Sequence, residues 1–159
     1  MIKQYYSWKL RKRKKSSQYN TDLLRLMKDV HSILIVCVEK NTAIMSFSSN
    51  LQNLYPSGKI DTWVYSELSE KQRKGKSGVS KEVRDDILKM KFDMIIDITP
   101  FVSEEWFYFF SFMAGDIKVG VSKSDDYQLY DLVISFGTGR TVVDGYRMVS
   151  EYIKKLADI

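Results

Sequence analysis

The stretch DMIIDI, residues 93–98, is a short and nearly continuous run of apolar residues. Continuous rather than alternating apolar residues are typical of a strand that is covered on both faces of a sheet. Three further runs have the same character: ILIVCV (33–38), IKVGV (117–121) and DLVISF (131–136). A fifth, KIDTWVYS (59–66), alternates, which favours a place nearer the edge of the sheet. The sequence therefore predicts a sheet of five strands.

Helical stretches separate most of these strands. We expect helices over residues 42–54, 81–90, 103–115 and 141–156, and a polar, basic loop over residues 67–80. Asn41 or Thr42 is suited to cap the first helix. Ser103, followed by two glutamates, is suited to cap the third, and Gly115 to end it.

Strands that alternate with helices point to parallel strands joined by right-handed crossovers. The predicted fold is a single-domain, three-layer, doubly wound (Rossmann-like) α/β domain. Its mainly parallel sheet is expected in the order 2-1-3-4-5. With 159 residues the chain has room for one well-packed core. We assign residues 1–20 to a basic helical arm and residues 21–159 to the domain.

Positive charge is concentrated in the arm. Residues 1–20 contain seven basic and no acidic residues, whereas the other 18 basic and 20 acidic residues of the chain give −2. The net charge of +5 therefore comes from the arm and not from the rest of the chain. The body lacks the positive field expected of a domain that grips a polyanion with its whole surface.

Cysteine and histidine are too few for several kinds of site. Cys37 and His31 are the only residues of these two types, so neither a disulfide nor a Cys/His zinc set forms within one chain. Cys37 is expected to be a small buried hydrophobe. We predict no metal, no cofactor and no catalytic residue, and a cytoplasmic location, because no apolar window is long enough to span a bilayer.

Ligands of an open parallel sheet bind beyond the carboxyl ends of the strands, where the strand order reverses. In the predicted order this crevice is lined by Glu39, Lys40, Asn41 and Thr42 after the first strand, and by Asp97, Thr99 and Pro100 after the third. Lys40 is suited to hold a phosphate or carboxylate; Glu39 and Asp97 are suited to orient hydroxyls or transfer protons. The simpler interpretation is that polar residues cap and solvate the strand ends.

The stretch GTGR, residues 137–140, follows the last strand and has two interpretations. It fails the dinucleotide fingerprint, because Val142 occupies the third glycine position, and it lacks the ending of a P-loop. Glycines at a strand-to-helix turn permit positive φ, and Thr141 with Asp144 has the spacing of a capping box. The alternative is a weak anion site formed by Gly137, Thr138, Gly139 and Arg140 at a helix N-terminus.

The segment SEEWFYFFSFMAG, residues 103–115, is apolar nearly all round. One stripe of a helix cannot contain all of its aromatic residues. It is therefore either buried on two sides or, between Trp106 and Met113, forms a contact with a second copy or another protein.

The arm combines aromatic residues with a run of cations. The basic residues that we assign to an anionic partner are Lys9, Arg11, Lys12, Arg13, Lys14 and Lys15. Three alternatives are open: a solvated arm without a dedicated partner, RNA bound through its phosphates and stacked bases, and an anionic membrane surface.

The order of these motifs resembles a small bacterial α/β family of unknown function. FDMIIDI, a helix, IKVGVSKS, YDLVISF and a final amphipathic helix carry that resemblance. Residues 31–123 are also similar to the amino-terminal half of heptosyltransferase-like glycosyltransferases, through ILIVCV, NLYPSGKIDTWVY, KFDMIIDI and GDIKVGV. The loop EKNTAIMS departs from that family, because it lacks the glycine-containing turn. Both resemblances imply the fold rather than a reaction.

Together these patterns favour a non-enzymatic binding or adaptor domain whose basic arm attaches to an anionic partner, RNA before membrane. The alternative is a half-glycosyltransferase-like domain that binds a small phosphorylated or nucleotide-sugar ligand at the carboxyl ends of the strands.

Overall fold

The computed structural model describes residues 23–75, 78–124, 127–135 and 141–158. Within these ranges five parallel strands form one sheet in the order β2-β1-β3-β4-β5. The strands are β1 (Ser32–Cys37), β2 (Lys59–Val64), β3 (Lys91–Asp97), β4 (Ala114–Val121) and β5 (Leu132–Ile134). The predicted doubly wound order is confirmed, as is the edge position of the alternating strand.

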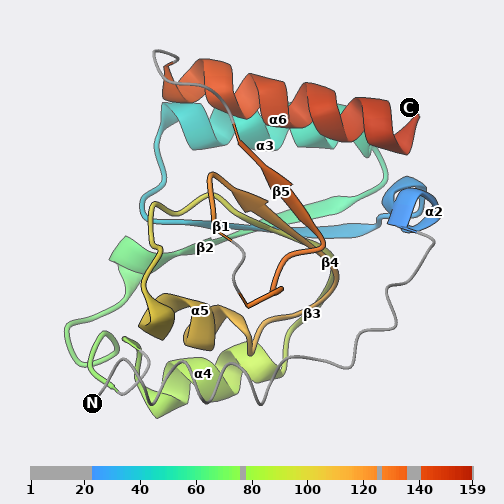
Figure 1. Ribbon diagram of the computed structural model, residues 1–159. Coiled ribbons are helices and arrows are strands. Elements are labelled where there is room, and N and C mark those ends of the chain that lie inside the picture. The colour runs from blue at the N-terminus through green and yellow to red at the C-terminus, as the bar shows by residue number, and fades with distance from the viewer. Residues whose placement is uncertain (1–22, 76–77, 125–126, 136–140, 159) are drawn as a thin grey trace.

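Helices cover both faces of the sheet (Figure 1). Helices α3 and α6 lie on one face, and α4 and α5 on the other. The helices are α2 (Leu23–Lys28), α3 (Thr42–Leu54), α4 (Lys81–Leu88), α5 (Glu104–Phe110) and α6 (Val142–Ala157), with a short 3-10 helix η1 (Tyr65–Glu67) after β2. This arrangement is the predicted three-layer α/β fold.

Strand β1 supplies side chains to both cores, which explains its continuous apolar sequence. Successive side chains of a strand point to opposite faces. Ile33, Ile35 and Cys37 accordingly join the core beneath α3 and α6, whereas Leu34 and Val36 join the core on the α4 and α5 side. Cys37 is the predicted buried hydrophobe, and burial raises the pKa of its thiol to about 11.

Side-chain caps begin the helices where the sequence indicated. The Asn41 Oδ1 atom accepts a hydrogen bond from the Ile44 N–H at 3.0 Å, and Ser103 Oγ accepts from Trp106 N–H at 3.2 Å. Thr141 Oγ1 accepts from the Asp144 N–H at 3.2 Å. Each such cap contributes about 1 kcal/mol to helix stability.

The predicted role of Gly115 is wrong. Helix α5 ends at Phe110, a turn follows, and Gly115 lies inside β4. A Cβ atom at this position would lie 2.8 Å from Cγ1 of Ile95. The glycine therefore permits a close approach to the neighbouring strand instead of ending a helix.

The aromatic helix α5 is packed inside the chain. The side chains from Trp106 to Phe110 are all buried, as is Met113. Trp106 lies against Trp63 of the edge strand, with ring centroids 6.0 Å apart. Burial on two sides, one of the two predicted explanations, is thus realised within one chain, and a partner contact through this helix stays a prediction.

Helix α2 is fastened to the end of α3. The hydroxyl of Tyr55 donates a buried hydrogen bond of 2.8 Å to the carbonyl oxygen of Met27. Met27 is itself part of the core between α3 and α6. Burial also raises the pKa of Tyr55 to about 12.

Across the described residues, we find no helix that combines the length and the apolar character needed to cross a membrane.

Candidate functional site

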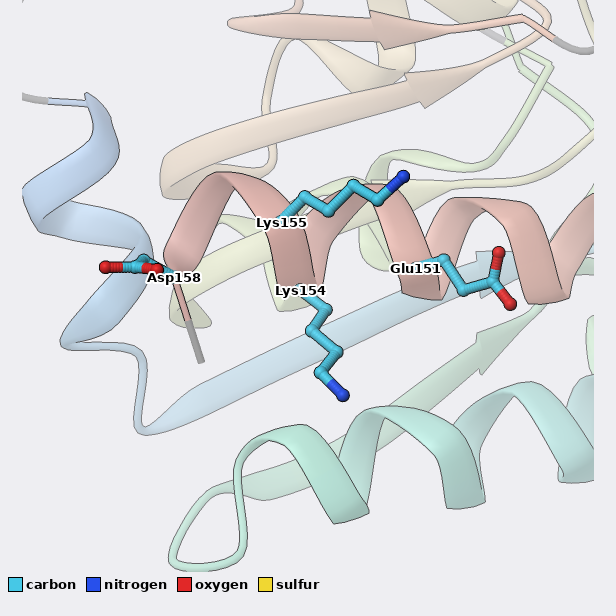
Figure 2. Close-up of a pocket in the computed structure, with 4 residues that line it drawn as sticks. All are labelled: Glu151, Lys154, Lys155 and Asp158. Carbon is cyan, nitrogen blue, oxygen red and sulfur yellow. The ribbon is translucent and has the colours of Figure 1, made fainter.

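A surface hollow that includes none of the predicted site residues lies at the end of the last helix. It is lined by Glu151, Lys154 and Lys155 of α6 and by Asp158, which caps the end of that helix (Figure 2). The two acidic and two basic side chains cancel in charge, and Asp158 already lies 4.0 Å from Lys28 Nζ. The hollow therefore offers no preference for a charged ligand.

The predicted crevice lies where the strand order reverses between β1 and β3. Lys40, Asn41 and Thr42 are exposed there at the start of α3, as is Glu39. Asp97 and Thr99, by contrast, are buried at the end of β3. The structure brings Asp97 and Thr99 into contact with each other, and both are buried, whereas Lys40 is exposed.

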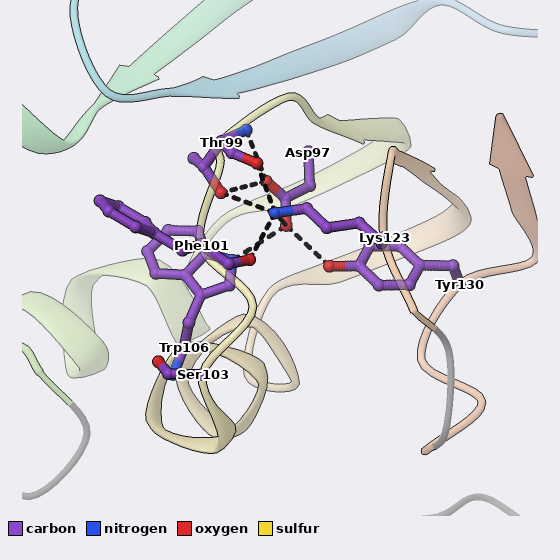
Figure 3. Close-up of polar contacts among 7 residues, drawn as sticks. All are labelled: Asp97, Thr99, Phe101, Ser103, Trp106, Lys123 and Tyr130. Atoms are coloured by element: carbon purple, nitrogen blue, oxygen red, sulfur yellow. Dashed lines mark hydrogen bonds and ion pairs between the residues drawn. The ribbon is translucent and has the colours of Figure 1, made fainter. Parts of the chain in front are cut away.

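The carboxylate of Asp97 accepts four hydrogen bonds from neutral groups (Figure 3). Its Oδ1 atom accepts from the N–H and the hydroxyl of Thr99, at 3.0 and 2.7 Å. Its Oδ2 atom accepts from the indole N–H of Trp106 at 2.9 Å and from the hydroxyl of Tyr130 at 2.7 Å. Both oxygens are therefore engaged by protein donors.

Lys123 brings a positive charge to the same cluster. Its Nζ atom lies 3.4 Å from Asp97 Oδ2, and both side chains are 0% exposed. The ammonium group also donates to the carbonyl oxygens of Thr99 at 2.5 Å and Phe101 at 2.6 Å, and to Thr99 Oγ1 at 2.9 Å. A buried ion pair is thus surrounded by further hydrogen bonds, which is the condition under which such pairs are tolerated.

The turn after β4 directs Lys123 inward. Ser122 has a positive φ of 53°, and its N–H donates to the carbonyl oxygen of Ile134. At Gly120 an added Cβ would lie 2.9 Å from the ring of Tyr130 and 3.0 Å from Cγ of Lys123. The glycine therefore leaves the space in which these two side chains converge on Asp97.

The electrostatic balance of the pair is set by burial. Burial lowers the pKa of Lys123, and the attraction of Asp97 opposes this shift. In this conformation neither charged group meets solvent, so neither is placed to touch a substrate. The arrangement fastens β3, α5 and the turn after β4 to one another.

Three residues of this cluster were not predicted from the sequence: Trp106, Lys123 and Tyr130. The sequence holds a signal for one of them, Lys123. An aspartate inside a run of buried isoleucines requires a partner, because an unpaired buried charge is strongly unfavourable. A lysine just beyond the adjacent strand is a natural candidate for that partner.

The other aspartate of DMIIDI lies at the amino end of β3. Asp93 Oδ2 accepts from the N–H groups of His31 and Ser32, both at 2.8 Å, and from the Ser32 hydroxyl at 3.1 Å. Partial burial alone would raise the pKa of Asp93, but these hydrogen bonds outweigh it and hold that pKa below its ordinary value of 3.8.

Gly137, Thr138, Gly139 and Arg140 lie outside the described residues, as do the basic residues between Lys9 and Lys15.

Within the described ranges, we find no group of three or more His, Cys, Asp or Glu side chains placed to hold a metal ion.

Comparison with known proteins adds no relative to this description. No protein family, no curated protein and no solved structure matches the chain.

Proposed function

We propose that the chain is a non-enzymatic binding or adaptor domain whose basic arm attaches to RNA. The observation that carries this proposal is the separation of charge: the arm, residues 1–20, holds seven basic and no acidic residues, whereas the rest of the chain sums to −2. Such a cationic segment gains affinity for a polyanion by releasing its condensed counterions. Its tyrosines and Trp8 supply rings on which unpaired bases stack.

The cluster around Asp97 supports a non-enzymatic body. Of the two carboxylates predicted for proton transfer in the crevice, Glu39 is exposed, whereas Asp97 is 0% exposed and has both oxygens hydrogen-bonded inside the protein. A general base has to reach the proton that it abstracts. The body is therefore better suited to carry the arm than to act on a substrate.

A salt titration tests the attachment to RNA. Binding of the full chain to a fluorescent single-stranded RNA is measured by anisotropy over a range of salt concentrations. In a variant with residues 11–15 all changed to Gln, the slope of log K against log salt should fall by about 3.5, because each phosphate contact contributes about 0.7 on single strands.

The matched control removes as many charges from the body. Lys28, Lys59, Lys74, Lys89 and Lys91 are exposed, and their combined change to Gln should leave the slope nearly unchanged. Equal losses in the two variants would show that total charge, not the arm, determines binding, and would contradict the proposal.

Vesicles distinguish RNA from a membrane surface. The same two variants are sedimented with vesicles of phosphatidylserine and of phosphatidylcholine. Arm-dependent binding to phosphatidylserine without measurable binding to RNA would replace RNA by an anionic membrane as the partner.

A small phosphorylated or nucleotide-sugar ligand at the carboxyl ends of the strands is a second candidate. It is favoured by Lys40, Asn41 and Thr42, which are exposed at the start of α3 where the strand order reverses. Thermal-shift measurements with nucleotides and sugar phosphates test it. Stabilisation that is lost in a Lys40→Ala, Arg140→Ala double variant supports this candidate; stabilisation that persists there opposes it.

A further inference from the structure

The ammonium group of Lys123 is surrounded by oxygen atoms of one short segment. The carbonyl oxygens of Thr99 and Phe101, the hydroxyl oxygen of Thr99 and Oδ2 of Asp97 all lie between 2.5 and 3.4 Å from Nζ. All four come from residues 97–101, the end of β3 and the start of the loop that leads to α5 (Figure 3). Lys123 reaches them from the turn that follows a different strand, β4.

This set of oxygens is chemically complementary to a cation. Carbonyl oxygens accept hydrogen bonds but donate none, and a carboxylate adds a negative charge. An ammonium group has three N–H donors and no acceptor, so it satisfies such a set without leaving a group unpaired. A neutral apolar side chain in the same place would leave the carbonyls of Thr99 and Phe101 without this donor and Asp97 without its counter-charge.

The segment is held in its shape by contacts that do not involve Lys123. The Asp97 carboxylate is oriented by the Trp106 indole and by the Tyr130 hydroxyl. Thr99 is held by its own N–H and hydroxyl, which both donate to Asp97 Oδ1. The side chains of Asp97 and Thr99 are thus oriented by contacts other than those with the ammonium group.

We propose that residues 97–101 form a binding site for a primary ammonium ion, that Lys123 is its built-in occupant, and that a small primary alkylammonium ion binds there when the lysine is shortened. The alternative is that Lys123 acts mainly through its apolar stem, as a space-filling residue of the core. The two explanations differ in what restores the protein after truncation.

Chemical rescue in the full chain separates them. Lys123→Ala removes three methylene groups and the ammonium group, which together correspond to n-propylammonium. We expect this variant to have a lower Tm than the wild type. n-Propylammonium at neutral pH should raise its Tm in a saturable way, whereas the Tm of the wild type should shift no more than with any other salt.

The control ion is tetramethylammonium, which has the same charge but no N–H donor. It should not rescue Lys123→Ala beyond its effect on the wild type. The control variant is Lys89→Ala, in which an exposed lysine is truncated, and n-propylammonium should not raise its Tm selectively. Equal shifts by the two ions, or no selective rescue of Lys123→Ala, would overturn the proposal.

A measurement on the wild type decides the matter if Lys123→Ala does not fold. Nitrogen-15 NMR detects lysine ammonium groups whose protons exchange slowly with water. We expect one such protected ammonium signal with nuclear Overhauser contacts to the Thr99 side chain. If no lysine ammonium of the wild type is protected from exchange near neutral pH, Lys123 is not bound as proposed.

Discussion

The two ends of β3 hold their aspartates in different ways. Asp93, at the amino end, is partly buried and accepts hydrogen bonds from neutral groups of β1 and the residue before it. Asp97, at the carboxyl end, is fully buried. Its partners come from the loop to α5, from α5 itself, and from the two ends of the segment that joins β4 to β5. One end uses an adjacent strand, the other a convergence of distant segments.

The two aspartates are therefore expected to contribute differently: one to the stability of the fold, the other to the choice of a single loop arrangement. Neutral donors around the partly exposed carboxylate of Asp93 stabilise its charged form and together outweigh the cost of its partial burial. A buried ion pair loses hydration on both sides, so its net contribution to stability is small even though breaking it is costly. We infer that the amino end supports the register of β1 and β3, whereas the carboxyl end selects one arrangement of the loops.

The largest expected effect comes from removing the buried cation. Lys123→Met keeps the apolar stem but leaves Asp97 as an uncompensated buried charge. We expect the free energy of unfolding to fall by about 3–5 kcal/mol, measured by urea denaturation followed by circular dichroism. The Asp97→Asn, Lys123→Met double variant should lose less than the sum of the single losses. Strict additivity would show that the two charges are not coupled.

A smaller effect is expected where space alone is disturbed. Gly120→Ala places a Cβ atom against the ring of Tyr130 and the stem of Lys123, and overpacking of this kind costs about 1–3 kcal/mol. Gly115→Ala is the matched comparison on the same strand, because its Cβ would meet a single side chain, that of Ile95, at 2.8 Å from Cγ1 and 2.9 Å from Cδ1. Unfolding titrations should show the larger loss for Gly120→Ala, and the reverse order would contradict the convergence described at Asp97.

The smallest effect should appear as pH dependence at the amino end. Because the pKa of Asp93 in the folded protein is below its ordinary value of 3.8, its stabilisation is complete above that value and is lost as the pH falls further. Asp93→Asn should therefore make the free energy of unfolding less dependent on pH below about 4. His31, whose charge also favours the ionised Asp93, stays unchanged in this comparison. An unaltered acid profile would exclude Asp93 as a contributor.

The architecture was predictable because each strand can be recognised from the pattern of its own residues. Continuous apolar runs such as ILIVCV and DMIIDI require cover on both faces, and the alternating run that contains Trp63 belongs at an edge. Helix caps such as Asn41 and Ser103 were also visible, because the capping side chain and its backbone partner are three residues apart. The error at Gly115 arose because a glycine that ends a helix and a glycine that admits a neighbouring side chain look alike in sequence.

The site was less predictable because its contacts are distant in the chain. Asp97 and Thr99 were correctly placed at the carboxyl end of a strand, but sequence periodicity does not tell whether such a carboxylate faces solvent or turns inward. That outcome depends on Tyr130, 33 residues away, and on Lys123, whose partners lie 22 and 24 residues back along the chain. Only the three-dimensional arrangement shows that they meet.

The hydrogen bond between Tyr55 and Met27 has a mechanical consequence. Residues 1–22 are connected to the domain through α2, which lies beside the amino ends of the strands in Figure 1. Any tension on those residues therefore enters the fold at α2, and is resisted first by Tyr55 and by the packing of α2 on α6. The ammonium of Lys123 lies beyond the carboxyl ends of the strands, at the end of the sheet opposite to α2.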